Sequence, residues 1–559
     1  MRLLAWLAIL SCCVVSRVNA QPVISPRGIV SPASYTPAGL PSGPIARGAF
    51  FAIFGPRLGT STSGSLSYPL SNTLSGVQVL VTQGSTTVNA IPYFVNSTLV
   101  NAIMPSNAPL GQVAIYVVNG NSKSPPSPAV VVNANFSAFT QYGYGFGPGL
   151  IQNFSNGVFS LNTTSSPAKP GQAIVLYGTG LGPVTYADNI APSAGTLPTQ
   201  VEIFIGGESV PAQYSGRNVC CSAFDQINFQ LPSDVALGCW VPLQVRTSGA
   251  FVSNVVTMSI SSDGSPCSDP LNPLSKALTA QNKFGLIALM RVAMNEDVGL
   301  AAPGNITTDT AMMTFQQENF NGLPAFHPIF SLPPAGTCTM YATSGDLLAG
   351  HAFPAGGTTG QFFNAGASIN LAPAAGNAFT VKRPTSNARG FQPLGSTMTL
   401  PGASGATYTT LFLNPGNFTA SGSGGSDVGA FQAAFVMPAP LSWTNRDRIS
   451  PVNRSQPLTL NWSNAPSGQP VVIFGGAVDL PSNGSAVFAC VASPGATSFT
   501  IPANILQALP PTRANLVRSK GAIYVGSFSS QSPTTFSATG LDTGLVLPGS
   551  FVGKTVIFQ

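Results

Sequence analysis

Few residues in this 559-residue chain could carry out acid–base or metal chemistry. The two histidines, His327 and His351, lie in Pro- and Gly-rich loops, and neither belongs to an HExxH or similar ligand spacing. The sequence also lacks a GxSxG nucleophile motif. Glycoside hydrolysis needs two carboxyl groups about 5 to 10 Å apart. Candidates for such a pair are Glu296, Asp297, Asp309 and Glu318.

Aromatic side chains offer a second kind of chemistry, because flat rings pack against the apolar faces of sugars. Tyr142, Tyr144 and Phe146 alternate with glycines in one segment, and an exposed strip of this kind could bind a carbohydrate. The same segment could instead be a packing loop between domains. Trp462 ends a short predicted strand, where it could be a ligand platform or the buried core residue of a small sandwich.

Six cysteines follow the N-terminal segment that contains Cys12 and Cys13, namely Cys220, Cys221, Cys239, Cys267, Cys338 and Cys490. Six thiols allow 15 pairings, and the sequence does not choose among them. We favour two bridges among the first four, with Cys338 to Cys490 as the remaining long-range pair. A zinc site is the alternative, but the adjacent Cys220 and Cys221 lack the two-residue gap of a zinc knuckle.

A repeated unit organises about residues 25–262 of the chain, which contain the aromatic segment and the first three of the six cysteines. Gly48–Gly59 (GAFFAIFGPRLG) and Gly171–Gly182 (GQAIVLYGTGLG) share the same glycine spacing. β-branched and aromatic runs follow both copies in the same order, separated by Gly, Pro and Asn, which is typical of antiparallel sandwiches. The sequence therefore predicts two tandem sandwiches. The residues that mark the repeat are Gly48, Gly55, Gly59 and Asn101 in the first copy and Gly171, Gly178, Gly182 and Asn228 in the second.

This repeat is similar to a known family. Gly28–Val30 and Pro32–Tyr35, followed by the first glycine unit, resemble the opening of the Solibacter-type uncharacterised C-terminal domain of secreted acidobacterial proteins. In the second copy, Tyr177–Pro183 and Asp225–Phe229 match the same pattern more closely. The resemblance spans about residues 25–262. It implies an immunoglobulin-like sandwich related to the IPT/TIG fold, with no catalytic residue to transfer.

The N-terminal residues 1–20 are typical of a secretory signal peptide, with Arg2 before the apolar run Leu3–Val15 and small residues before Gln21. A lipoprotein site that tethers Cys12 to a membrane is the alternative. Both predict an extracellular or cell-surface protein. No later apolar run reaches 18 residues, so we expect no transmembrane segment after signal cleavage. The scattered basic residues argue against nucleic-acid binding.

With 59 Gly and 50 Pro and only 7% charged residues, the composition predicts an all-β protein. We expect tandem immunoglobulin-like β-sandwiches followed by further β-sandwich domains. Within the C-terminal half, Lys283–Met294 and Tyr408–Leu413 are predicted strands and Ala503–Leu509 a short helix. The predicted units are the signal peptide at 1–20, sandwiches at 21–140 and 141–262, a β-rich domain at 263–440 and a fibronectin-like sandwich at 441–559.

The sequence favours a non-catalytic binding, adhesion or scaffold protein whose partner is a polysaccharide or another surface protein. It predicts no cofactor and no metal. Two alternatives stay open. One is a polysaccharide-active enzyme whose catalytic part lies within 263–440, with the sandwiches as accessory modules. The other is a purely structural envelope protein.

Overall fold

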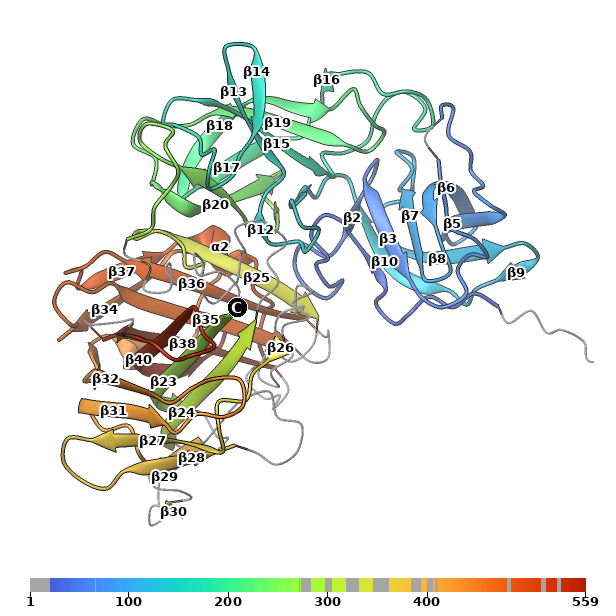
Figure 1. The fold of residues 1–559 in the computed structure, drawn as a ribbon. Helices are drawn as coiled ribbons and strands as arrows, with labels where there is room; N and C mark the ends of the chain where they lie inside the picture. Colours follow the sequence, from blue (N-terminus) through green and yellow to red (C-terminus); the bar gives the residue numbers. More distant parts are fainter. Residues whose placement is uncertain are drawn as a thin grey trace, which may run out of the picture.

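In the computed structural model nearly all elements are strands, which confirms the predicted all-β fold. Figure 1 shows two N-terminal sandwiches, in blue and in cyan to green, beside a larger C-terminal body. None of the helices in the described residues is long and apolar enough to cross a bilayer. The predicted signal peptide, His327 and His351 lie outside the described residues. The structure describes residues 21–65, 67–270, 272, 283–296, 304–317, 331–344, 361–383, 394–399, 406–407, 411–479, 484–513, 519–529 and 534–559.

The first sandwich pairs its strands in the order β1-β3-β7-β6-β5-β8-β10-β2, with β4 on β6 and β9 on β8. Every pair is antiparallel except β10 with β2. Its strands are β1 (Ile29–Val30), β2 (Ile45–Ala46), β3 (Phe50–Phe54), β4 (Ser63–Gly64), β5 (Val77–Gln83), β6 (Thr86–Val95), β7 (Leu99–Ile103), β8 (Gly111–Asn119), β9 (Ser122–Lys123) and β10 (Ser127–Val132).

The second sandwich has the order β12-β22-β20-β17-β18-β19-β15-β13-β14. Read in reverse from β15, this order repeats the first sandwich from β3 onward, including a parallel last pair. The predicted duplication is therefore confirmed at the level of strand pairing. The strands are β11 (Ser137–Ala138), β12 (Gly147–Pro148), β13 (Ile151–Ser155), β14 (Val158–Leu161), β15 (Ala173–Thr179), β16 (Gly195–Thr196), β17 (Val201–Ile205), β18 (Glu208–Arg217), β19 (Asp225–Gln230), β20 (Gly238–Thr247), β21 (Phe251–Val252) and β22 (Val256–Ile260).

The two copies share a β-bulge at the marker asparagines. In the first copy the register shifts where Asn101 pairs with Phe94, and in the second where Asn228 pairs with Tyr214. The N-terminal parts of β6 and β18 pair with β5 and β17, and their C-terminal parts, which contain the bulge, pair with β7 and β19. An extra residue bends a strand, so this bulge lets one long strand pass from one layer of the sandwich to the other.

The marker glycines also have matching roles. Gly48 and Gly171 precede β3 and β15 and adopt positive φ angles of 67° and 78°, which favour glycine. Gly55 and Gly178 leave no room for a Cβ atom. That atom would overlap the Val23 carbonyl oxygen in the first copy and the Phe136 ring in the second. The shared spacing thus reflects one turn and one close backbone approach in each sandwich.

The C-terminal body is built on a sheet of order β25-β36-β35-β38-β40-β23-β24-β29-β30, with β26 on β24 and β39 on β40. Its strands are β23 (Lys283–Glu296), β24 (Gly304–Gln317), β25 (Cys338–Ser344), β26 (Gln361–Phe362), β29 (Leu394–Thr399), β30 (Ala406–Thr407), β35 (Val471–Asp479), β36 (Gly484–Ala492), β38 (Ser519–Phe528), β39 (Thr534–Phe536) and β40 (Thr543–Val556).

Strands from both sides of residue 440 pair in this sheet. β23 runs parallel to β40, and β25 is antiparallel to β36. The predicted division into 263–440 and 441–559 therefore does not separate two sandwiches, because local turn signals carry no information about pairing over such a distance. Two small sheets cover the large one. They contain β27 (Ser368–Pro373), β28 (Phe379–Lys382), β31 (Gly416–Gly422) and β32 (Phe431–Met437), and β33 (Ser442–Trp443), β34 (Leu458–Ser463) and β37 (Ser498–Ile501).

The local predictions in the C-terminal body have mixed outcomes. The strand predicted at Lys283–Met294 is confirmed as β23, and the helix predicted at Ala503–Leu509 is confirmed as α2 (Ala503–Gln507). The 3₁₀-helix η2 (Arg446–Arg448) was not predicted. The strand predicted at Tyr408–Leu413 is wrong at 411–413, which is irregular, and the rest of it lies outside the described residues. The backbone N–H groups of Phe412 and Leu413 bond to a side chain, Asp309, instead of to a neighbouring strand.

Contacts join the three parts of the molecule. Between the sandwiches, Thr179 Oγ accepts the Phe50 N–H at 2.9 Å and donates to the Ala223 carbonyl at 2.7 Å. Phe50 and Ala223 also belong to one apolar cluster with Ile103. Between the second sandwich and the C-terminal body, Asn504 Nδ2 donates to Gln244 Oε1 at 2.8 Å, and both side chains are buried.

Candidate functional site

The aromatic strip predicted from sequence lies between β11 and β12, where the second sandwich meets the C-terminal body. The ring centroids of Tyr142 and Tyr144 are 6.3 Å apart, and those of Tyr144 and Phe146 are 6.2 Å apart. Phe146 is buried and meets the ring of Tyr341 on β25 edge-on at 5.7 Å. Tyr144 is 40% exposed and Tyr142 is half-buried. Phe146 is therefore a packing residue, and only the two tyrosines reach solvent.

Trp462 on β34 belongs to the core of the C-terminal body. It is 3% exposed, and its indole N–H donates to the Ala496 carbonyl at 2.8 Å. It packs in one cluster with Leu460 and Ile501. No ring face is presented to a ligand, so the interpretation of Trp462 as a platform is wrong and that of a sandwich core residue is right.

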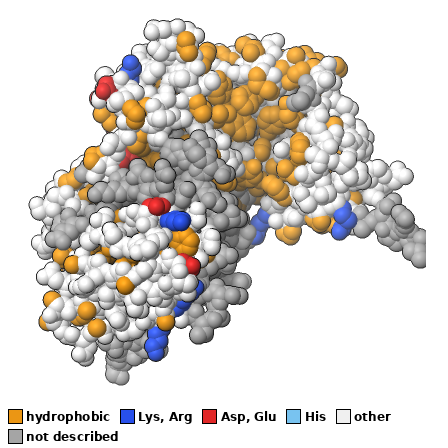
Figure 2. Space-filling model, in the orientation of Figure 1, with side chains coloured by type: hydrophobic (Ala, Val, Ile, Leu, Met, Phe, Trp, Pro, Cys, Tyr) orange, Lys and Arg blue, Asp and Glu red, His pale blue; other side chains and the backbone are white. Residues whose placement is uncertain are grey.

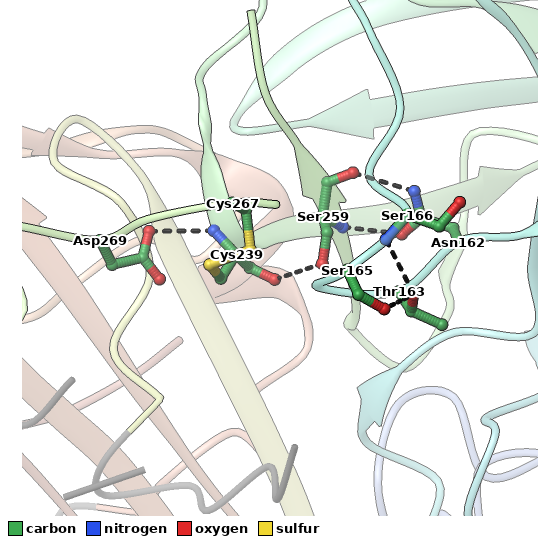
Figure 3. Close-up of a disulfide and its surroundings, with 8 residues drawn as sticks. All are labelled: Asn162, Thr163, Ser165, Ser166, Cys239, Ser259, Cys267 and Asp269. Atoms are coloured by element: carbon green, nitrogen blue, oxygen red, sulfur yellow. Dashed lines mark hydrogen bonds between the residues drawn. A yellow bond between two sulfur atoms is a disulfide. The ribbon is translucent and has the colours of Figure 1, made fainter. Parts of the chain in front are cut away.

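Tyr142 lines a cavity of about 130 Å³ at the edge of the second sandwich, together with Trp240 of β20. Asn162, Thr163, Ser165 and Ser259 are among its polar lining residues. Figure 3 shows how these are held: Asn162 Nδ2 donates to the Ser259 carbonyl at 2.9 Å, and the Ser259 N–H donates to Asn162 Oδ1 at 2.7 Å. The polar groups at this edge are thus held in place before any ligand arrives.

The chemistry of this cavity follows from its lining. The lining residues, all within the described part of the chain, include no carboxylate and no imidazole, and Cys239 is held in a disulfide. Burial raises the pKa of the Tyr142 phenol, so it stays an uncharged hydroxyl at neutral pH. The site can therefore hold an uncharged polar molecule against an aromatic ring. Trp240 was not singled out from the sequence, because it lies in the apolar run Cys239–Leu243, which is typical of a buried strand.

A disulfide between Cys239 and Cys267 forms one wall of this edge and fastens the segment that leaves the second sandwich (Figure 3). Two residues further on, Asp269 Oδ1 accepts the Cys239 N–H at 2.9 Å. Burial raises the pKa of Asp269 to about 6, and its other oxygen, Oδ2, has no hydrogen-bond partner. Asp269 also lines a larger cavity of about 330 Å³, whose other walls are mostly proline and aliphatic residues, among them Pro334 and Val472.

All six cysteines expected to form disulfides do so. Cys338 on β25 is bonded to Cys490 on β36, as predicted, across one pair of the large sheet. The other four form two bridges, also as predicted, and the structure assigns them as Cys239 to Cys267 and Cys220 to Cys221. Among the described residues, no group of three or more His, Cys, Asp or Glu side chains could hold a metal ion.

The structure tests one of the four carboxylates proposed for glycoside hydrolysis. Asp309 is fully buried and pairs with Arg291 through two hydrogen bonds of 2.7 and 2.8 Å. Its Oδ2 atom also accepts the N–H groups of Phe412 and Leu413, at 2.7 Å each. Asp309 thus serves to hold the irregular segment 411–413 on the sheet. Asp297, Glu318 and the side chain of Glu296 lie outside the described residues.

A second buried ion pair holds the glycine-rich turn of the second sandwich. Asp225 is fully buried and Arg217 is 3% exposed, and Arg217 Nη1 lies 2.6 Å from Asp225 Oδ1. Asp225 Oδ2 accepts the Leu181 N–H at 2.7 Å, and Arg217 Nη2 donates to the Gly182 carbonyl at 3.0 Å. Burial raises the pKa of Asp225 to about 6 against the opposing effect of Arg217.

No protein-family model matches the sequence, and no curated protein is significantly similar to it. Among solved structures, domains 5–6 of the S-layer protein SbsC align with 43% of this chain and 99% of their own, at 15% identity and a TM-score of 0.15. Immunoglobulin domains 1–5 of Sidekick-1 align with 92% of this chain and 96% of their own, at 10% identity and a TM-score of 0.12. The chicken CNTN1 FN1–FN3 domains align with 72% of this chain and 98% of their own, at 8% identity and a TM-score of 0.13. Because these TM-scores are low, the fold is assigned from the strand pairing of this chain and not from the aligned structures.

Proposed function

We propose that the chain is an exported, non-catalytic binding protein that displays its sandwiches outside the cell or on its surface and takes a polysaccharide as ligand. The observation that carries this proposal is the cavity that Tyr142 and Trp240 line together with uncharged polar residues, among them Asn162 and Ser259, which hydrogen bonds hold in place. Such a combination suits a sugar ring, which has apolar faces and hydroxyl edges.

Two further observations support an exported protein. Three disulfides occur in the described residues, and such bonds persist in oxidising compartments outside the cytosol. The signal peptide predicted at 1–20 accords with that environment. The resemblance of residues 25–262 to a module of secreted acidobacterial proteins also supports export. We propose that both sandwiches belong to this IPT/TIG-related group.

The test is a pull-down of the purified Gln21 to Gln559 protein on insoluble polysaccharides and on cell envelopes, with reducing sugar measured in the same supernatants. We expect retention on at least one polysaccharide without sugar release. Sugar release would contradict the proposal and favour an enzyme. Retention on envelopes that protease treatment abolishes would indicate a protein partner, and no retention on any matrix would favour a structural protein.

A further inference from the structure

The outer face of the β14-β13-β15-β19-β18 sheet in the second sandwich carries a row of side chains that crosses five strands. Pairing places Leu161 opposite Gln152, Gln152 opposite Val175, Val175 opposite Asn228 and Asn228 opposite Tyr214. Directly paired residues point to the same side of a sheet, so all five side chains share one face. At about 4.8 Å per strand, the row spans about 19 Å.

This face is the solvent side of the sandwich. The alternate residues of the same strands, Ile151, Ile174 and Phe229 among them, belong to the core cluster. Outward residues keep exposed area instead: Leu161 is 42% exposed and Phe159, also on β14, is 53% exposed. Gln152, Asn228 and Tyr214 are half-buried, and Val175 forms an apolar floor between them.

Amide groups occupy the centre of this face and are fixed by one another. Asn218 Nδ2 donates to Gln226 Oε1 at 2.6 Å, and Gln226 Nε2 donates to Asn228 Oδ1 at 2.7 Å. The Tyr177 hydroxyl donates to Gln152 Oε1 at 2.7 Å. In these bonds Gln152 and Asn228 act through their carbonyl oxygens, so their NH₂ groups remain available as donors for a ligand.

Aromatic rings stand around the amides. At one end, Phe154 and Phe159 form a cross-strand pair with ring centroids 4.8 Å apart. At another corner, the ring centroids of Tyr177 and Phe224 are 5.4 Å apart. At the far end of the row, the Tyr214 ring is fixed because its hydroxyl donates to the Arg217 carbonyl at 2.6 Å.

The same face carries no charge at neutral pH. The five strands are described throughout, and their acidic and basic residues lie elsewhere: Asp225 and Arg217 are buried in their ion pair, and Glu208 is at the β17–β18 turn. In Figure 2, hydrophobic side chains gather over the second sandwich and its junction with the first, and no charged side chain is visible among them. A protein partner would more usually be met by Arg together with aromatic residues, and an acidic glycan by Lys or Arg.

This face combines rigid rings, uncharged amide donors and an extended row of side chains, and the combination suits a long, uncharged ligand with both apolar faces and hydroxyl groups. We propose that this face, defined by Gln152, Phe154, Phe159, Tyr177, Asn228 and Tyr214, binds a linear, uncharged polysaccharide whose sugar rings stack on the aromatic side chains while their hydroxyls bond to the amides. The proposal rests on the proposed function and adds a second, longer site to the small cavity at Tyr142. The row length fits several sugar units in sequence.

The experiment is affinity electrophoresis of the folded, disulfide-bonded protein in gels with or without soluble neutral polysaccharides: mixed-linkage glucan, xylan, glucomannan and galactomannan, with alginate as a charged comparison. We expect at least one neutral polysaccharide to retard the protein and alginate not to. Phe159→Ser and Gln152→Leu should each weaken this binding at least about tenfold, which corresponds to about 1.4 kcal/mol.

The matched control is Val158→Ser. Val158 is the neighbour of Phe159 on the same exposed strand, is 65% exposed and points to the opposite side, so this variant should bind as the original chain does. Circular dichroism and thermal unfolding establish that each variant is folded. Binding that survives both Phe159→Ser and Gln152→Leu would overturn this site and leave the proposed function standing, and loss in Tyr142→Ala alone would assign the ligand to the cavity. Retardation by none of the neutral polysaccharides would overturn this proposal and the polysaccharide ligand together.

Discussion

The buried pair of Arg217 and Asp225 is expected to be a main determinant of the stability of the second sandwich. Replacing Arg217 with Met removes the charge that compensates a fully buried carboxylate, and also the bond to the Gly182 carbonyl. Breaking such a pair by removing one partner costs about 3 to 5 kcal/mol. Solvent does not screen this ion pair, because both side chains are buried.

The same variant should show a defined pH dependence. Burial already raises the pKa of Asp225 to about 6, and removing Arg217 removes an effect that lowers it. A carboxyl whose pKa is higher in the folded than in the unfolded state binds its proton more tightly when folded. Stability is then greatest at low pH and is lost as pH rises through the folded pKa. Arg217→Met should therefore cost less free energy at pH 5 than at pH 7.5.

Hydrogen exchange in the peptides of β15 and β19, measured with mass spectrometry at both pH values, reports the unfolding free energy of this sandwich by itself. The comparison variant is Lys169→Met, which removes an exposed positive charge close to β15 and should change the free energy by less than about 0.5 kcal/mol. A loss below about 1 kcal/mol in Arg217→Met at pH 7.5, or a larger loss at pH 5, would refute this reasoning.

Three more predictions concern the C-terminal body and its link to the second sandwich. The double variant Cys338→Ser/Cys490→Ser should lose up to about 5 kcal/mol in urea unfolding, because the bridge closes a loop with a sequence separation of 152 residues; an unchanged midpoint would contradict this. Asp309→Asn should lose about 3 to 5 kcal/mol in the same assay, since it leaves the mostly buried Arg291 without its carboxylate partner, whereas the loss of a solvent-exposed ion pair would cost almost nothing. Because burial raises the pKa of Asp269 to about 6, stability should fall as pH rises from 4 to 6, and Asp269→Asn should flatten that fall in urea titrations at several pH values.

The duplication and its turns could be predicted from the sequence because they are local. Gly48 and Gly171 mark turns with positive φ, and Asn101 and Asn228 mark a bulge. In each copy a few neighbouring residues are therefore enough to indicate the local backbone geometry. The division at residue 440 failed for the opposite reason. β23 pairs with β40 across more than half of the C-terminal sequence, and hydrophobic patterns do not encode which strands meet.

The candidate site could be predicted only in part. Glycine-flanked aromatics drew attention to Tyr142 and Tyr144, which reach solvent, but also to Phe146, which is buried, because composition does not reveal exposure. The amide and aromatic face was missed although its signal is present. In Gln226–Gln230 (QINFQ) polar residues alternate with apolar ones, and only the register between strands shows that Asn228 and Gln152 share one row.

The most direct test of the account is the affinity of the folded chain for neutral polysaccharides, compared between the original protein, Phe159→Ser and Val158→Ser. We expect binding of at least one neutral polysaccharide, a loss of about tenfold or more in Phe159→Ser and no change in Val158→Ser. Equal binding by all three proteins would contradict the assignment of the face. Absence of binding by the original protein to every polysaccharide would contradict the polysaccharide ligand.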